Sequence, residues 1–184
     1  MDSTSGATDP KKETNVKREV WEWTKAILIA VIAALLIRQF LFTMIVVDGP
    51  SMQETLQDGD RLAVTILDMK LNGPARDDIV ICYYPDYTTP CVKRVIGMPG
   101  ETIRIEQGIT YINEQPYEQN YIEHQSMVPF GPYTVPEGSY FVMGDNRSNS
   151  HDSRDADVSA IPKDKILGKV RMVVWPFQRF QTIG

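Results

Sequence analysis

The sequence has few cysteines and no dense stretch of positive charge. Only two cysteines, Cys82 and Cys91, occur among 184 residues; they are too few for a disulfide scaffold and lack the paired spacing of a zinc site. The formal net charge is -5, and no lysine- and arginine-rich stripe is present to displace counterions from a phosphate backbone. These absences exclude a nucleic-acid partner, and they predict no metal site and no cofactor.

Long apolar runs are also scarce, but one lies near the N-terminus at residues 26–37, AILIAVIAALLI. A bilayer span needs about 20 residues, and residues 23–42 reach this length if Lys25 and Arg38 extend their charges outward. A cleaved secretory signal is less favoured because no small-x-small site follows, and a buried core helix would need a larger protein to cover it. We therefore predict an uncleaved transmembrane helix at residues 20–43.

The charges around this run predict its orientation. Five basic residues precede it and Arg38 alone lies near its far end, which places the N-terminus in the cytoplasm by the positive-inside rule. The polar tail, residues 1–19, has almost nothing to bury and is predicted to be disordered. Residues 44–184 are then predicted to form an extracytoplasmic domain of a single-pass cell-membrane protein.

The part of the chain after residue 48 shows no long apolar period of 3.6 residues. Short runs rich in Val, Ile and Tyr recur between turn signals, which predicts a mainly β domain. Residues 113–138 are richer in Pro, Gly and polar groups and are predicted to be a looser insertion. The predicted strands are residues 45–47, 61–66, 78–84, 91–96, 102–106, 109–112, 140–143 and 169–175, with one helical turn within residues 161–167.

The two cysteines bracket a loop between two of the predicted strands. Cys82 and Cys91 can therefore face each other across a hairpin, and outside the cytoplasm such a pair can oxidise. Two free buried thiols are the alternative, and the geometry of the pair decides between them.

A candidate nucleophile lies just past the apolar segment, in Gly-Pro-Ser-Met-Gln-Glu-Thr-Leu at residues 49–56. A serine hydroxyl is a weak nucleophile at neutral pH, so Ser51 needs a base that can take its proton. The alternative is that Ser51 caps a short helical turn, because a serine followed three residues later by Glu54 is also a capping box.

The histidines are poor candidates for the base. His124 lies in the looser insertion. Ser150-His151-Asp152 resembles a serine triad only superficially, because neighbours in an extended chain point to opposite faces and cannot converge.

Lys93 is the remaining candidate base, in the strand-like run at residues 91–97. A free lysine side chain has a pKa of about 10.4, so a base near neutrality requires burial that lowers this value by about 3. The nearby charge of Arg94 can add to that effect. The alternative is an exposed lysine on an edge strand with an ordinary pKa.

Five motifs follow the apolar segment in a fixed order. They are GPSMQETL at residues 49–56, GDRL at 59–62, RDDIV at 76–80, KRVIGMPGE at 93–101 and GDNRSNSHDSR at 144–154. As a set they resemble the bacterial type I signal peptidases, in their short, single-anchor, Gram-positive form. The resemblance implies an antiparallel β-sheet catalytic domain and a Ser-Lys endopeptidase that removes signal peptides from exported preproteins.

The resemblance also implies roles for individual residues. Ser51 matches the nucleophile, Lys93 the general base, and Ser150 a hydroxyl that orients the lysine, while the backbone N–H of Ser51 would serve the oxyanion hole. Glu54 departs from the family pattern, which usually has proline there, and this puts catalytic efficiency in doubt. Asp145, Asp152 and Arg154 match residues that shape the site. The alternative for this motif is structural, with a turn at Asp145-Asn146 and ion pairs of Arg147 and Arg154. Arg94, next to Lys93, is a further supporting residue.

The substrate-binding residues are predicted from alternation along the strand before Ser51. Ile45 and Val47 fall on one face, and Met52 and Leu56 lie nearby, so together they can form shallow apolar pockets. Such pockets match the family's preference for small residues at the -1 and -3 positions of the preprotein. The alternative is that these side chains are simply core.

Two further functions compete with this one. A self-cleaving repressor-type protease has a similar Ser-Lys site, but it is joined to a DNA-binding domain, which the apolar segment and the acidic charge disfavour. A membrane-tethered β module that binds a partner without catalysis is the other. The predicted partners are therefore preproteins and the lipid bilayer.

Overall fold

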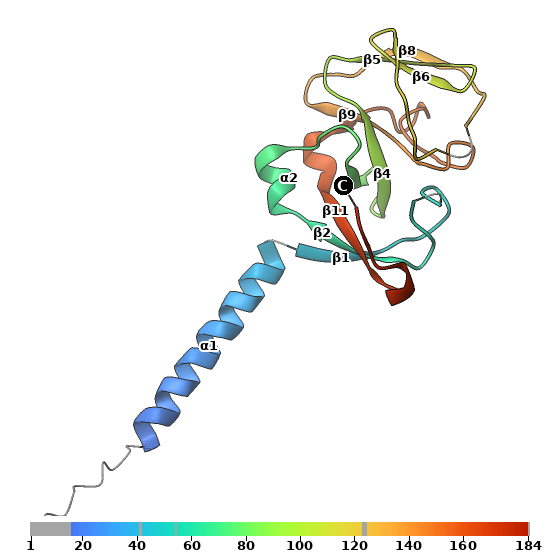
Figure 1. Cartoon of the computed structure of the whole chain (residues 1–184). Coiled ribbons are helices and arrows are strands. Elements are labelled where there is room, and N and C mark those ends of the chain that lie inside the picture. Colours follow the sequence, from blue (N-terminus) through green and yellow to red (C-terminus); the bar gives the residue numbers. More distant parts are fainter. Residues whose placement is uncertain (1–15, 41, 54, 123–124, 184) are drawn as a thin grey trace, which may run out of the picture. The chain divides into compact units, whose positions relative to one another are not determined.

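The computed structural model describes residues 16–40, 42–53, 55–122 and 125–183 (Figure 1). The chain divides into two compact units, Met1–Ile37 and Arg38–Gly184. The first unit holds most of one helix, and the second holds the strands.

Helix α1 (Val16–Phe40) contains neither glycine nor proline, and large apolar side chains are exposed along it. Residues 16–19, assigned to the polar tail from sequence, are part of this helix, and residues 1–15 lie outside the described part of the chain. Across the residues that the structure describes, no helix combines the length and the apolar character needed to cross a bilayer. The transmembrane helix at residues 20–43 stays a prediction.

The main sheet lies in the second unit and is antiparallel throughout. Among the described residues its strands follow the order β1-β2-β11-β3-β4-β9-β10, and β12 pairs with β11. This confirms the predicted mainly β, antiparallel domain. The strands are β1 (Phe42–Val46), β2 (Arg61–Thr65), β3 (Ile79–Tyr83), β4 (Pro90–Gly97), β9 (Ser139–Met143), β10 (Ile161–Pro162), β11 (Ile166–Trp175) and β12 (Gln181–Thr182).

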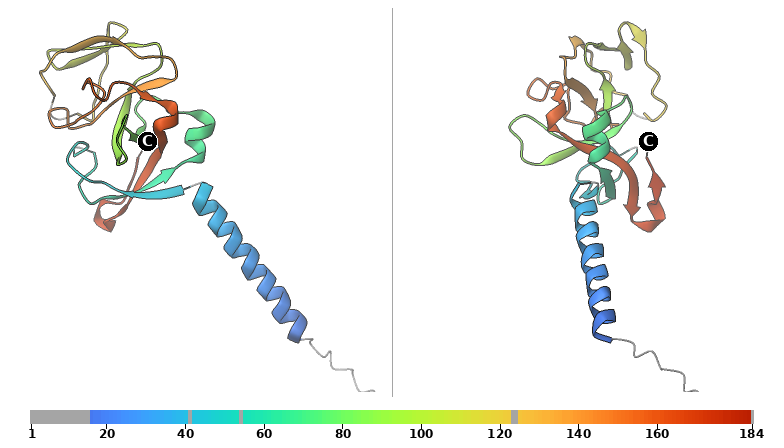
Figure 2. Two further views of the ribbon diagram at one scale, coloured as in Figure 1. Left: turned by 180° about the vertical axis from the view of Figure 1, so that it is seen from behind. Right: turned by 90° about the vertical axis from the view of Figure 1, so that its left-hand side faces the viewer.

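A second, smaller sheet has the order β7-β6-β5-β8, and both views of Figure 2 place it at one end of the second unit. The turn between β5 and β6 uses Gln107 and Gly108, both with positive φ, as a tight hairpin requires. Strand β8 lies inside the segment predicted to be a looser insertion. The strands are β5 (Thr102–Glu106), β6 (Ile109–Ile112), β7 (Gln115–Pro116) and β8 (Phe130–Thr134).

Short helical elements complete the second unit. Helix α2 (Leu67–Asn72) was not predicted, because six residues are too few to establish a helical period. The 3-10 turn η1 (Lys163–Lys165) lies within residues 161–167, where a helical turn was expected. A further 3-10 turn, η2 (Phe177–Arg179), joins β11 to β12.

The core is built on both faces of the central strands. On β3, Ile79 and Ile81 pack into one apolar cluster while Val80 and Cys82 pack into another. A third cluster joins the two sheets, because Ile96 of β4 packs with Ile103 of β5. Burial on both faces makes β3 and β4 the rigid centre of the domain, and β4 carries the candidate base.

Candidate active site

Ser51 lies in the turn that follows β1. The turn is closed by hydrogen bonds from the Gln53 N–H to the Pro50 carbonyl at 3.0 Å and from the Leu56 N–H to the Met52 carbonyl at 2.6 Å. Met52 anchors the turn in the core. From the far side, the Asn146 N–H donates to the Ser51 carbonyl at 3.0 Å. The backbone at the nucleophile is thus held from two segments far apart in sequence.

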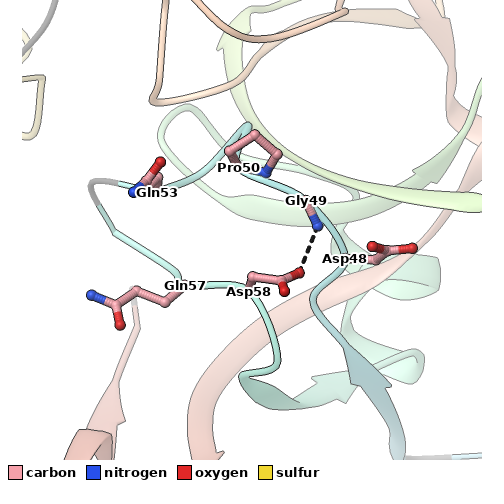
Figure 3. Close-up of a pocket in the computed structure, with 6 residues that line it drawn as sticks. All are labelled: Asp48, Gly49, Pro50, Gln53, Gln57 and Asp58. Atoms are coloured by element: carbon pink, nitrogen blue, oxygen red, sulfur yellow. Dashed lines mark hydrogen bonds between the residues drawn. The ribbon is translucent and has the colours of Figure 1, made fainter.

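Two aspartates, Asp48 and Asp58, are among the residues that line a cavity at this turn. The cavity has a volume of about 590 Å³. Figure 3 draws the six residues that line it and the hydrogen bond from the Gly49 N–H to Asp58, which is 2.8 Å long. Gly49 has a φ of 95°, a conformation that glycine adopts without a steric penalty. The strand can therefore reverse direction immediately before Ser51.

Lys93 lies in β4, which is paired with β3 on one side and β9 on the other. Its exposed fraction is 4%, so it is not the exposed edge-strand lysine of the alternative interpretation. Its Nζ lies 2.8 Å from Ser51 Oγ and donates to the Val92 carbonyl at 3.0 Å. Within the described residues the Ser51 hydroxyl is bonded to this amine, and Glu54, the partner in the capping-box alternative, lies outside them.

Burial lowers the pKa of Lys93 below its ordinary value. The charges that oppose this effect come from Cys91 and Cys82 when ionised, and from Asp152 and Asp145. Arg94 does not supply the repulsion expected from sequence, because its guanidinium is bonded to Asp145. Removing an ammonium from water is costly, so burial shifts the Lys93 equilibrium towards the neutral amine.

Asp152 organises the loop after β9. It is fully buried and accepts hydrogen bonds from the Gly144 N–H at 3.0 Å, from Ser150 Oγ at 2.7 Å and from Arg154 Nε at 2.8 Å. Burial acts to raise the pKa of Asp152, but the hydrogen bonds and charge of Arg154 outweigh it and hold the pKa below its usual range. In the described residues Ser150 bonds to Asp152, and the orientation of Lys93 by the Ser150 hydroxyl stays a prediction.

Arg94 and Asp145 form a buried ion pair that ties the site together. Arg94 Nη2 and Nε lie 2.7 and 2.9 Å from the Asp145 carboxylate, and Thr55 Oγ1 donates to the same carboxylate at 2.5 Å. The Asp145 N–H points to Met52 Sδ at 3.4 Å. The ion pair therefore links the Ser51 turn, β4 and the end of β9.

A groove of about 630 Å³ contains both Ser51 and Lys93. Of the predicted substrate-binding residues, Ile45, Val47 and Met52 line it, whereas Leu56 is fully buried in the core and does not. The opposite wall, residues 89–92, was not predicted from sequence. Sequence position could have indicated this wall, since Cys91 and Val92 immediately precede Lys93.

Over the described residues, no group of three or more His, Cys, Asp or Glu side chains is arranged to hold a metal ion.

The sequence profile of the family described as "Signal peptidase, peptidase S26" matches residues 20–175. The chain belongs to this family. A signal peptidase I from Bacillus licheniformis is 40% identical over 181 residues, covering 93% of this chain and 97% of that protein. Signal peptidase I T of Bacillus subtilis (strain 168) is 41% identical over 181 residues, covering 93% of this chain and 92% of the relative.

A solved structure of a signal peptidase I from Enterococcus faecalis V583 is 31% identical, covers 52% of this chain and 95% of that chain, and has a TM-score of 0.47. The family assignment rests on the sequence matches. It confirms the resemblance drawn from the five motifs, and it makes the chain a serine peptidase of the signal peptidase family.

Proposed function

We propose that the chain removes N-terminal signal peptides from exported preproteins, with Ser51 as nucleophile and Lys93 as general base. The observation that carries this proposal is the 2.8 Å separation of Lys93 Nζ and Ser51 Oγ. The amine is buried and its pKa is lowered by that burial, which is the condition a lysine must meet to accept a proton near neutral pH.

The mechanism follows from these two groups. Ser51 Oγ attacks the scissile carbonyl while its proton moves to the neutral Lys93 amine. The resulting ammonium protonates the leaving amine, and a water molecule, deprotonated by the same lysine, then hydrolyses the acyl-enzyme. The Ser51 backbone N–H has no acceptor among the described residues, so it is available to donate to the oxyanion.

The supporting residues act by positioning. The Arg94–Asp145 ion pair holds the Ser51 turn against β4, so the distance between hydroxyl and amine depends on it. Asp152 orders the loop that carries Ser150 and Arg154, and its charge acts on Lys93. Each of these groups affects the reaction through Ser51 or Lys93.

The groove supports a preference for small side chains at the -1 and -3 positions. Val47 and Met52 are almost fully buried where they line it, at 4% and 1% exposure. Apolar side chains packed this tightly leave shallow subsites, and a large residue would clash with the walls. The substrate class is therefore a preprotein with small residues before the cleavage point.

Membrane attachment is part of the proposal. The apolar run of α1 exposes Ile27, Leu28, Ile29, Val31, Ile32 and Leu35, and contact with lipid would remove this surface from water. Attachment through α1, with the N-terminus in the cytoplasm, would hold the groove near membrane-embedded substrates and raise their effective concentration.

Cleavage of a purified preprotein tests the dyad. We expect the unmodified chain to cut a preprotein carrying Ala-x-Ala before the junction, and Ser51→Ala and Lys93→Ala to leave it intact. Lys163→Ala removes an exposed lysine outside the site and is the matched control that keeps the unmodified rate. Processing by Lys93→Ala at the rate of the control would overturn the Ser-Lys mechanism.

Fractionation tests the location. The full chain should remain in the membrane pellet after alkaline carbonate extraction. Protease added outside intact spheroplasts should degrade the second unit while sparing an N-terminal tag. Recovery in the soluble fraction would refute attachment, and loss of the tag with the rest would refute the orientation.

A further inference from the structure

Two thiols lie beside the dyad, and the proposed peptide hydrolysis uses neither. Cys82 of β3 and Cys91 of β4 are directly opposite each other in the strand register, and both are free. Directly opposite residues of an antiparallel pair have Cα atoms about 4.5–5.5 Å apart. This lies inside the range of about 4.4–6.8 Å that disulfides span, so the separation of the two strands admits a bridge.

These thiols share a face of the sheet with the candidate base. Lys93 pairs with Val80 two residues along from the Cys82–Cys91 pair, and residues two apart on a strand point the same way. Cys91 also lines the groove together with Ser51 and Lys93. Any group attached to Cys91 would therefore occupy space that the substrate needs.

The two thiols differ in access. Cys91 is half-buried and faces the groove, with Sγ 4.0 Å from the Thr89 carbonyl, whereas Cys82 is fully buried. Burial raises the pKa of Cys82 to about 12 and also raises that of Cys91. Because the thiolate is the reacting form, exchange is slow at neutral pH, and it begins at Cys91.

We propose that Cys82 and Cys91 protect the groove against thiolation, with Cys91 as the site of attack by a low-molecular-weight disulfide and Cys82 as the resolving thiol. The Cys91 thiolate attacks one sulfur of the small disulfide RSSR, whose S–S bond breaks and releases one RSH. The Cys82 thiolate then attacks Cys91 Sγ and releases the second RSH. RSSR is reduced to two thiols, and the two protein thiols, which supply the two protons, are oxidised to one disulfide.

The two products of this chemistry differ in their effect on the groove. The mixed disulfide places R beside Ser51 and blocks the preprotein. The internal bridge lies between β3 and β4, which are already paired in this register, so the groove stays open. Resolution by Cys82 thus converts a blocked enzyme into an active one.

Treatment of the full chain with 2-hydroxyethyl disulfide tests the proposal, with intact mass and preprotein cleavage read in parallel. The unmodified chain should lose the mass of two hydrogen atoms and keep its untreated rate. Cys82→Ala should gain one hydroxyethylthio adduct and lose its rate until dithiothreitol is added. Cys91→Ala should gain no adduct, and each variant is compared with its own untreated rate.

Three outcomes would overturn the proposal: a lasting adduct on the unmodified chain, full activity of adducted Cys82→Ala, or loss of activity on forming the internal bridge. If Cys82→Ala does not fold, Cys82→Ser replaces it, and a mass time course of the unmodified chain must show the adduct before the bridge. The activity readout rests on the proposed function, whereas the masses do not. A chain that bridges but never cuts a preprotein would refute that function alone.

Discussion

Lys93 and Arg94 are neighbours on β4, and both are buried basic residues. They lie on opposite faces of the strand and have different partners. The Arg94 guanidinium meets the Asp145 carboxylate, while the Lys93 amine meets the Ser51 hydroxyl. Burial acts to lower the pKa of Arg94, but bonding to Asp145 outweighs it and the pKa is raised; the pKa of Lys93 is lowered. The partner, more than the burial, therefore decides in which direction the pKa of each basic side chain shifts.

The largest effect on activity should come from removing the neutral amine. Lys93→Met keeps an unbranched chain but no base, and we expect kcat for preprotein cleavage to fall by about 10²–10⁴-fold, the usual contribution of a general base. Lys93→Arg should be as inactive, since a guanidinium stays protonated. Cleavage by Lys93→Arg at neutral pH clearly faster than by Lys93→Met would contradict the role of a neutral amine.

Lys93→Met should not lower the free energy of unfolding. A lysine with a lowered folded-state pKa binds its proton less tightly in the folded chain than in the unfolded chain. Protonation therefore lowers the free energy of unfolding. This loss grows as pH falls from about 10.4 towards the lowered pKa and is complete below it. Lys93→Met removes this loss. In denaturant unfolding at neutral pH, the variant should be at least as stable as the unmodified chain. A gain in stability that became larger as pH rises would contradict the lowered pKa of Lys93.

On the other face of β4 the opposite result is expected. Arg94→Met leaves the Asp145 carboxylate buried without its cation, which typically costs about 3–5 kcal/mol of unfolding free energy. Arg94→Met combined with Asp145→Leu removes both charges and should recover much of that loss. Arg104→Met, at an exposed ion pair, is the control with little effect. A double variant as unstable as Arg94→Met would mean that packing, not charge, holds the pair.

Much of this fold was predictable because local patterns carry it. The strands from β2 to β6, together with β9 and β11, coincide with Val-, Ile- and Tyr-rich runs, and the positive φ of Gln107 and Gly108 fits the predicted turn. The order of the strands was not predictable. Insertion of β11 between β2 and β3 pairs segments about a hundred residues apart, and no local property of either segment specifies that register.

The candidate site, too, was predictable only where local motifs identify its residues. Ser51 and Lys93 were identified through motifs, while physical reasoning alone left an exposed lysine possible, because burial depends on which strands flank β4. Leu56 was assigned to the groove from its nearness to Ser51, but the turn directs it into the core. The hydrogen bond from Ser150 to Asp152 was not predicted, since the partner of a short side chain depends on the loop conformation.

A smaller, directional effect is expected where a carboxylate acts on Lys93 from a distance. The charge of Asp152 raises the pKa of Lys93 against the lowering by burial. Asp152→Asn should therefore shift the rising limb of the pH–rate profile to lower pH, while kcat falls because the loop is less ordered. The measurement is the cleavage rate across the pH range. Partial unfolding would lower the maximum cleavage rate without shifting the rising limb of the profile along the pH axis.

Asp157→Asn is the matched control for this shift. Asp157 is exposed and pairs with His151 rather than with the dyad, so its profile should overlay that of the unmodified chain. A limb that moves to higher pH in Asp152→Asn would show that lost order, and not lost charge, controls the base.

The smallest effect should come from the aromatic ring that covers Arg94. The guanidinium carbon lies 3.9 Å from the centroid of the Tyr121 ring, and a cation–π contact of this kind contributes about 0.5–1 kcal/mol. Tyr121→Leu should lower the unfolding free energy by about that amount, measured by denaturant titration. Tyr121→Phe keeps the ring and loses only the hydroxyl that donates to Asp77, so it should lose less. If the two variants were equally destabilised, the ring would not contribute to holding Arg94. The contrast between Arg94 and Lys93 would then rest on the hydrogen bonds of Arg94 to Asp145, Thr55 and the Asp77 carbonyl.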